Sequence, residues 1–179
     1  MYVGKAMTGR RGAGINAMSA IDMALWDIKG KYENKPVFEL IGGKKQDYVV
    51  PYASLQPIGH SFQEYKDSLV AWAIKAKDLG FKAVKSEVTL NGPYAHSGLN
   101  ENDERTTEVV AAVRNALGPE IKLMIDVQYR WHDAEAALKT VKDWGEYDIY
   151  FLETPVWTDD INSYARMHEE APMKIAAGE

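Results

Sequence analysis

The stretches LMID (123–126), YFLE (150–153) and KIAAGE (174–179) decide the fold, because each is a mainly apolar run that ends in an acid. Short apolar runs between polar segments predict buried β-strands. The three runs begin about 25 residues apart, which leaves room for one helix between each pair. We therefore expect three consecutive strands of one parallel sheet, joined by helices.

The same alternation extends from these runs toward the N-terminus. The ranges expected as strands are 48–54, 83–88, 122–126, 149–153 and 173–177. The ranges expected as helices are 17–29, 36–40, 61–79, 103–117, 133–144 and 160–169. This order predicts an α/β fold with right-handed crossovers. An open doubly wound sheet and a (β/α)8 barrel both satisfy it, and periodicity alone does not choose between them.

Local signals indicate where some helices begin and end. Ser61 and Glu64 have the spacing of a capping box, in which the two residues satisfy each other's backbone N–H groups. Gly30 is expected to close the first helix. Trp72 and Leu79 are expected in the buried stripe of the helix that follows Ser61.

Composition and charge narrow the class of protein. Of the 179 residues, 46% are hydrophobic, which is enough to build a core. The net charge is −5 with no evident basic patch, which argues against nucleic acid as a partner. Cysteine is absent, so disulfides and thiolate metal sites are excluded. No apolar run approaches the ~20 residues that span a bilayer, and the N-terminus lacks the apolar core of a signal peptide. We therefore expect a cytoplasmic protein with no membrane partner.

The acids at the strand ends predict a metal site. Asp126, Glu153 and Glu179 each end one strand, and the carboxyl ends of parallel strands meet at one edge of the sheet. Three carboxylates placed together repel one another unless a cation lies between them. A set of oxygen ligands suits Mg²⁺. The alternative is that each acid simply solvates a loop or caps a helix, but three at successive strand ends favour the metal.

Lys85 and Glu87 lie at the end of the preceding strand, on one face because of the two-residue period of a strand. If Val84 packs against helices, both point to the opposite face. A lysine beside a metal can hold a substrate carboxylate or, with a lowered pKa, act as a base. A structural Lys–Glu pair is the alternative. Lys85 and Glu87 are both candidate catalytic residues.

Three further residues are weaker candidates. Tyr94 and His96 lie in the long polar segment after the strand that ends near Glu87, and both can reach a substrate from there. Gln128 follows Asp126 by two residues and can point to the same site. We treat His96 as a candidate catalytic residue and Tyr94 and Gln128 as candidate substrate-binding residues. A solvated loop side chain is the alternative for His96.

Several motifs in order resemble the mandelate racemase branch of the enolase superfamily. They are SAIDMALWDIKGK (19–31), PVFELIGG (36–43), VPYAS (50–54), LMIDVQ (123–128), FLETP (151–155) and KIAAGE (174–179). The resemblance implies strands one to five of a partial TIM barrel. It places the end of an N-terminal capping domain and its linker helices in residues 1–45, and the first half of the barrel in residues 46–179.

The resemblance also implies a chemistry. Asp126, Glu153 and Glu179 would bind Mg²⁺, and a proton α to the carboxylate of a small acid would be removed to give an enediolate. The family pattern Lys-x-Lys reads Lys85-Ser86-Glu87 here, which puts two-base racemisation in doubt and favours an acid-sugar dehydratase.

The sequence is also compatible with other functions. A racemase or epimerase, a cycloisomerase, and a catalytically silent fragment are the alternatives to a dehydratase. The family keeps further barrel strands with a His–Asp dyad or a second lysine, so this chain alone is expected to be inactive. Unpaired sheet edges favour a homo-oligomer.

Overall fold

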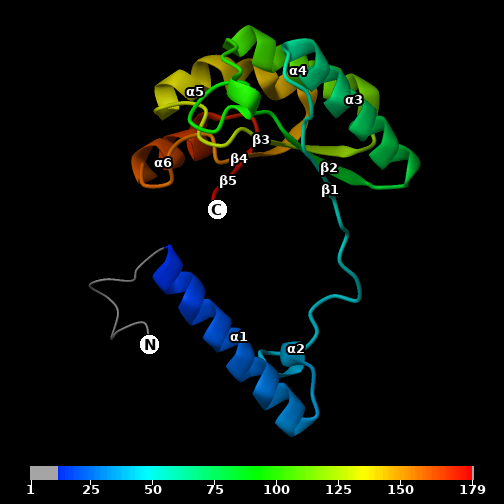
Figure 1. Ribbon diagram of the computed structural model, residues 1–179, viewed down its shortest axis with the longest axis vertical. Coiled ribbons are helices and arrows are strands. Elements are labelled where there is room, and N and C mark those ends of the chain that lie inside the picture. Colours follow the sequence, from blue (N-terminus) through cyan, green and yellow to red (C-terminus); the bar gives the residue numbers. More distant parts are fainter. Residues whose placement is uncertain (1–11, 179) are drawn as a thin grey trace. The chain divides into compact units, whose positions relative to one another are not determined.

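The structure is a computed structural model that describes residues 12–178, and these residues form two compact units (Figure 1). The first unit extends to Val49 and the second begins at Val50. In the described part of the first unit, helix α1 spans Ala13–Glu33 and helix α2 spans Val37–Leu40. No helix within residues 12–178 has the length and apolar character needed to cross a membrane.

Helix α1 is longer than the sequence predicts, and the expectation that Gly30 closes it was wrong. The helix continues past Gly30 to Glu33, and its C-cap residue Asn34 adopts the left-handed conformation with φ 52°. Gly30 instead allows the backbone of Lys35 to approach helix α1 closely. A Cβ atom at Gly30 would lie 2.8 Å from the carbonyl oxygen of Lys35, where the chain turns toward α2.

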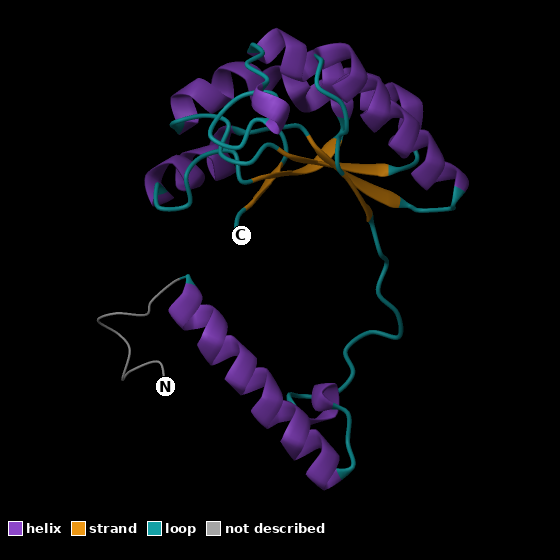
Figure 2. Cartoon of the chain, viewed as in Figure 1, coloured by secondary structure: helices purple, strands orange, loops and turns teal. Residues whose placement is uncertain are grey.

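The second unit is a parallel sheet whose strands alternate with helices (Figure 2). The strands, paired in the order β1-β2-β3-β4-β5, are β1 (Ala53–Leu55), β2 (Ala83–Glu87), β3 (Lys122–Asp126), β4 (Ile149–Glu153) and β5 (Lys174–Ala176). The helices are α3 (Phe62–Asp78), α4 (Asp103–Leu117), α5 (Ala134–Val141) and α6 (Ile161–Glu170), with 3-10 turns at His96–Gly98 and Lys142–Tyr147. The predicted α/β class is therefore confirmed, with five parallel strands as in the first half of a TIM barrel.

Some predicted boundaries were wrong for identifiable reasons. The strand expected at 48–54 begins only at Ala53, because the residues before it are exposed and include Pro51, which has no N–H to donate. In α3, Ala73 rather than Trp72 completes the buried stripe, and Leu79 is 68% exposed. The helix expected at 133–144 is a shorter α5, which continues as a 3-10 turn.

Side chains at the helix N-termini explain why these helices begin where they do. Ser61 accepts a hydrogen bond from Glu64 N, and the Glu64 carboxylate accepts one from Ser61 N, so the predicted capping box is confirmed. Asn102, Asp133 and Asp160 cap α4, α5 and α6 in the same general way, each accepting a backbone N–H three residues on.

The helices α3 to α6 cover one face of the sheet (Figure 1). The strand residues Val84, Ser86, Ile125 and Leu152 on that face are fully buried. Because side chains alternate along a strand, their neighbours in sequence lie on the opposite face. That face therefore carries the charged residues at the strand ends.

Candidate metal centre

The strand ends bring the predicted acids side by side. In the parallel register Glu87 is the partner of Asp126, and Asp126 is the partner of Glu153. Glu153 is in turn the partner of Ala176 on β5. Glu179, the third predicted ligand, lies outside the described residues. Two of the three predicted ligands are thus direct neighbours at one edge of the sheet.

Lys85 bridges these two carboxylates from β2. Its Nζ donates a hydrogen bond of 2.8 Å to Glu153 Oε2 and lies 3.7 Å from Asp126 Oδ2. The side chains of Lys85, Asp126 and Glu153 are only 15%, 10% and 17% exposed, so water screens their charges weakly. Lys85 therefore pairs with Asp126 and Glu153 rather than with Glu87, the alternative partner that the sequence offered.

The pKa of Lys85 reflects two opposing effects. Burial disfavours its charged form and is the largest single effect. The hydrogen bond to Glu153 and the charges of Glu153 and Asp126 together outweigh burial and hold the pKa of Lys85 above its ordinary value. Lys85 is therefore a cation in this arrangement.

The donor set at this edge suits Mg²⁺. Asp126 and Glu153 offer carboxylate oxygens, the ligands that Mg²⁺ prefers, and their surroundings already favour a positive charge. Within residues 12–178, no three His, Cys, Asp or Glu side chains are grouped closely enough to hold a metal ion by themselves. Two protein ligands are compatible with Mg²⁺, because this ion usually keeps several waters.

Replacing Lys85 by methionine should strengthen Mg²⁺ binding. The ammonium lies where a cation would approach Glu153, so Mg²⁺ must compete with it. We expect the dissociation constant for Mg²⁺ to fall roughly tenfold in Lys85→Met. Calorimetric titration measures this, with Lys82→Met, an exposed lysine just before the same strand, as the control. Weaker Mg²⁺ binding in Lys85→Met than in the control would contradict the arrangement.

Glu87 is held at the end of β2 by its neighbours. Its Oε1 accepts a hydrogen bond of 3.1 Å from Thr89 Oγ1. Its backbone oxygen accepts one of 3.0 Å from the hydroxyl of Tyr65, which in turn accepts one from Thr89 N. Burial raises the pKa of Tyr65, so this phenol stays protonated and able to donate. Glu87 thus has a fixed position beside Asp126.

His96 lies between the segment after β2 and the segment before α3. Its Nε2 lies 3.0 Å from the carbonyl oxygen of Gly59, and its ring meets that of Tyr65 edge-on at 5.5 Å. These contacts connect the segment after β2 to the segment before α3. A catalytic function for His96 stays a prediction, and its described contacts are those of a residue that orders two loops.

Gln128 lies two residues after Asp126, and Tyr94 lies in the segment after β2. Gln128 N donates a hydrogen bond of 3.1 Å to Asp126 Oδ1, so its backbone orients the predicted ligand. The ring of Tyr94 lies 5.6 Å from the ring of Tyr129, which follows Gln128 directly. The substrate-binding functions of Tyr94 and Gln128 stay predictions.

Sequence reasoning missed an ion-pair cluster that joins the segment after Asp126 to the start of α4. Asp103 accepts hydrogen bonds from Arg130 Nε at 2.9 Å, from Trp131 Nε1 at 3.1 Å and from Thr140 Oγ1 at 2.7 Å. The side chain of Arg130 is only 3% exposed. The sequence identified Asp103 only as the start of a helix, since no local pattern links it to residues 27 to 37 positions away.

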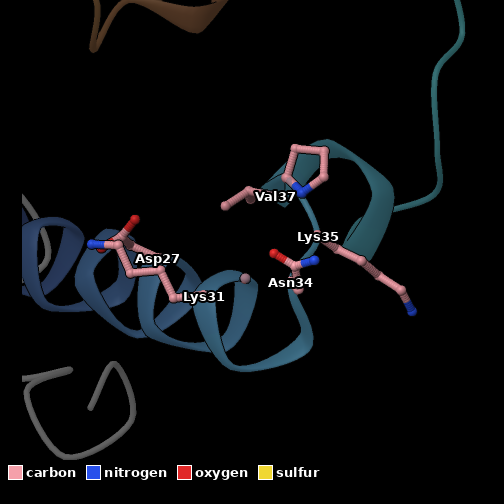
Figure 3. A pocket seen from close by; sticks show the side chains of 7 residues that line it. Asp27, Lys31, Asn34, Lys35 and Val37 are labelled. Atoms are coloured by element: carbon pink, nitrogen blue, oxygen red, sulfur yellow. The ribbon is translucent and has the colours of Figure 1, made fainter.

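The first unit contains a pocket of about 330 Å³ (Figure 3). Residues from the end of α1 and the start of α2 line it, among them Asp27, Lys31 and Asn34. Lys31 Nζ already pairs with Asp27 Oδ2 at 2.6 Å on the exposed helix surface. The pocket therefore presents an ordinary surface ion pair and belongs to a different unit from the strand-end acids.

The second unit is a parallel α/β sheet with the strand order of a half-barrel and with acids at its strand ends, and comparison with known proteins identifies the family. The sequence matches the family "Enolase C-terminal domain-like" over residues 68–179. It matches "Mandelate racemase / muconate lactonizing enzyme, N-terminal domain" over residues 2–42. The chain belongs to the enolase superfamily, as the resemblance of its motifs predicts.

Three relatives illustrate this membership. D-gluconate dehydratase of Thermoproteus tenax is 36% identical over 91% of this chain and 32% of its own length. The structure of the 3,6-anhydro-D-galactonate cycloisomerase from Zobellia galactanivorans has a TM-score of 0.82 and 34% identity, over 99% of this chain and 45% of that one. An enolase from Bradyrhizobium, complexed with magnesium and mandelic acid, has a TM-score of 0.78 and 26% identity, over 99% and 45%.

These relatives have two consequences. Members of the superfamily bind Mg²⁺, and the relatives of this chain include an acid-sugar dehydratase and a cycloisomerase. The chain spans less than half the length of each of these three relatives.

Proposed function

We propose that this chain is the metal-binding half of a Mg²⁺-dependent acid-sugar dehydratase. The observation that carries the proposal is the meeting of Lys85, Asp126 and Glu153 at one edge of the sheet. With Glu179 as third ligand, the two acids would hold Mg²⁺, which supplies stabilisation of the negative charge that develops on a substrate carboxylate. The similarity to D-gluconate dehydratase supports the choice of an aldonate substrate.

The residues of the chain have separate parts in this proposal. Lys85, a cation next to the acids, donates a hydrogen bond to one carboxylate oxygen of the substrate. Gln128, whose backbone is fixed to Asp126, contacts a substrate hydroxyl. Glu87 replaces a lysine that would serve as one of two bases, so removal of the α-proton by one base, followed by loss of water, fits better than racemisation.

The base that removes the α-proton is proposed to come from the part of the barrel that the relatives carry beyond the matched region. We also propose that residues 1–45 end a capping domain and that residues 46–179 form the first half of the barrel. For the 179-residue chain by itself we also propose a homo-oligomer, because in the described part of the sheet β1 pairs only with β2 and β5 only with β4.

A cycloisomerase is the second candidate. The observation that favours it is the 34% identity to the Zobellia cycloisomerase, which is close to the 36% identity to the dehydratase. Both reactions begin with removal of a proton α to a carboxylate, so the strand-end site serves either one. Analysis of the products separates them, because the dehydratase product is lighter than its substrate by one water, whereas a cycloisomerase product has the same mass as its substrate.

We expect the 179-residue chain to leave sugar acids unchanged, and a chain completed with the C-terminal barrel half of a dehydratase relative to convert them. The reason is that the proposed base is absent from the first chain and supplied in the second. The measurement is NMR of a panel of aldonates with Mg²⁺ in D2O, which detects both product and exchange of the C2 proton. Asp126→Asn in the completed chain serves as the matched control and should abolish both signals.

Two results would contradict the proposal. Conversion of an aldonate by the 179-residue chain would show that the base lies within it. The absence of both product and C2 exchange from the completed, folded chain on every aldonate would rule out the assigned reaction class.

A further inference from the structure

Three aromatic rings from three consecutive loops meet above the strand ends. Tyr94 lies in the segment after β2, Tyr129 in the segment after β3 and Trp157 in the segment after β4. The ring of Tyr129 lies 5.6 Å from that of Tyr94 and 4.5 Å from that of Trp157, so the three rings form one continuous row. We refer to these three residues as the aromatic row.

The row is tied to the strand-end acids through the backbone. Tyr129 is the third residue after Asp126, and Trp157 is the fourth after Glu153. Tyr129 N donates a hydrogen bond of 2.7 Å to the carbonyl oxygen of Thr154, which directly follows Glu153. The loop after β3 is thereby fastened to the loop after β4 next to both predicted ligands.

The backbone here is held in a costly conformation. Gln128 and Tyr129 have φ of 42° and 62°, and Thr154 has φ of 46°. Left-handed conformations of residues other than glycine cost about 1–2 kcal/mol each and persist where the surroundings enforce them, which is common at functional sites. The left-handed backbone conformation of Tyr129 places its ring between the rings of Tyr94 and Trp157.

A close packing of the loops completes the row. Gly92, with φ of 96°, presses against the backbone of the next loop: a Cβ there would lie 3.2 Å from Arg130 Cα and 3.3 Å from Tyr129 O. This approach lets the segment after β2 bring Tyr94 to Tyr129. The rings nevertheless stay accessible, since Tyr94 is 53% and Trp157 is 48% exposed.

Exposed rings in a fixed row are suited to bind a carbohydrate chain. Aromatic faces carry partial negative charge and attract C–H groups that carry partial positive charge. A sugar acid whose carboxylate lies at Asp126 and Glu153 must extend its remaining carbons away from the acids. Rings in the loops that directly follow these acids are within reach of that chain.

We propose that Tyr94, Tyr129 and Trp157 bind the C–H-bearing face of the carbon chain of a sugar acid and thereby select acids of several hydroxylated carbons over short ones. This inference rests on the proposed function, because it takes the carboxylate of the substrate to be held at the strand-end acids. It assigns to the row the recognition of chain length, which the metal and Lys85 cannot provide.

The test compares two acids that share the same head group. D-gluconate and glycolate both carry a carboxylate and an α-hydroxyl, but only gluconate has a further carbon chain. Saturation-transfer NMR of the 179-residue chain with Mg²⁺ measures binding of each. We expect Trp157→Leu and Tyr129→Leu each to weaken gluconate binding roughly three- to tenfold and to leave glycolate unchanged. Trp157→Phe, which keeps a ring, should retain most of the affinity, and Trp72→Leu, at an exposed tryptophan of α3, should behave as the wild type.

The outcomes separate this inference from the proposed function. If Asp126→Asn leaves the binding of both acids unchanged while the leucine variants weaken gluconate alone, the row binds sugars and the metal-site proposal fails. If the leucine variants bind gluconate as the wild type does, or lose both acids equally, the rings do not contact the chain and the inference is overturned. Absence of saturation transfer to gluconate in the wild type overturns it as well.

Discussion

Asp103→Ala should destabilise the second unit by about 3 kcal/mol. Removing Asp103 leaves the buried guanidinium of Arg130 without its carboxylate, and removes the acceptor of Trp131 Nε1 and Thr140 Oγ1. Arg130 Nη1 already has no hydrogen-bond partner among the described residues, and Nη2 otherwise reaches only the carbonyl oxygen of Glu101. Breaking a buried pair costs ~3–5 kcal/mol, and the 36% exposure of Asp103 places the expected loss at the lower end.

The control for this variant is Glu104→Ala, which removes an exposed acid from the same first turn of α4. It should change the free energy of unfolding by no more than about 0.5 kcal/mol. Urea denaturation monitored by circular dichroism measures both variants. Equal stabilities for Asp103→Ala and Glu104→Ala would show that the Arg130 cluster contributes nothing measurable.

The same cluster predicts a pH dependence. Burial alone would raise the pKa of Asp103, but hydrogen bonds from Thr140, Trp131 and Arg130 outweigh it, so the pKa lies below its ordinary value of 3.8. A carboxylate with a lowered pKa in the folded state stabilises the fold fully above its unfolded pKa. That stabilisation is lost as the pH falls through the lower folded pKa. The difference in stability between the wild type and Asp103→Ala should therefore shrink below about pH 3.8.

The regular elements could be predicted where the chain carries complete local signals. Strands β3 and β4 and helix α4 begin and end at the predicted residues, since apolar runs and a helix-stopping Gly118 mark their limits. The start of the strand expected at 48–54 could not be predicted from its apolar pattern. That start depends on pairing with β2, and the pairing begins only at Ala53.

The candidate site shows the same division. The position of Asp126 beside Glu153 follows from strand ends and a parallel register, both readable from sequence. The ion pair that Lys85 forms across β3 with Glu153 could not be predicted from the sequence, because pairing with the nearer Glu87 agrees equally well with the alternation of the strand. Contacts such as Arg130 to Asp103 and Tyr129 to Trp157 join separate loops, and no periodicity within one segment predicts them.

Binding of Mg²⁺ to Asp126 tests the central claim most directly. Asp126→Asn keeps the size of the side chain and an oxygen that can accept the hydrogen bond from Gln128 N, but it removes the charge. A carboxylate ligand binds Mg²⁺ more strongly than a neutral amide does, because its negative charge offsets the free energy that the ion loses when it gives up bound water. The matched control is Asp78→Asn, the same change at an exposed residue that ends α3.

Isothermal titration of Mg²⁺ into the wild-type chain and the two variants measures the effect. We expect Asp126→Asn to weaken Mg²⁺ binding at least about tenfold, and Asp78→Asn to bind as the wild type does. Equal affinities for the wild type and Asp126→Asn would contradict the assignment of the strand-end acids as the metal site.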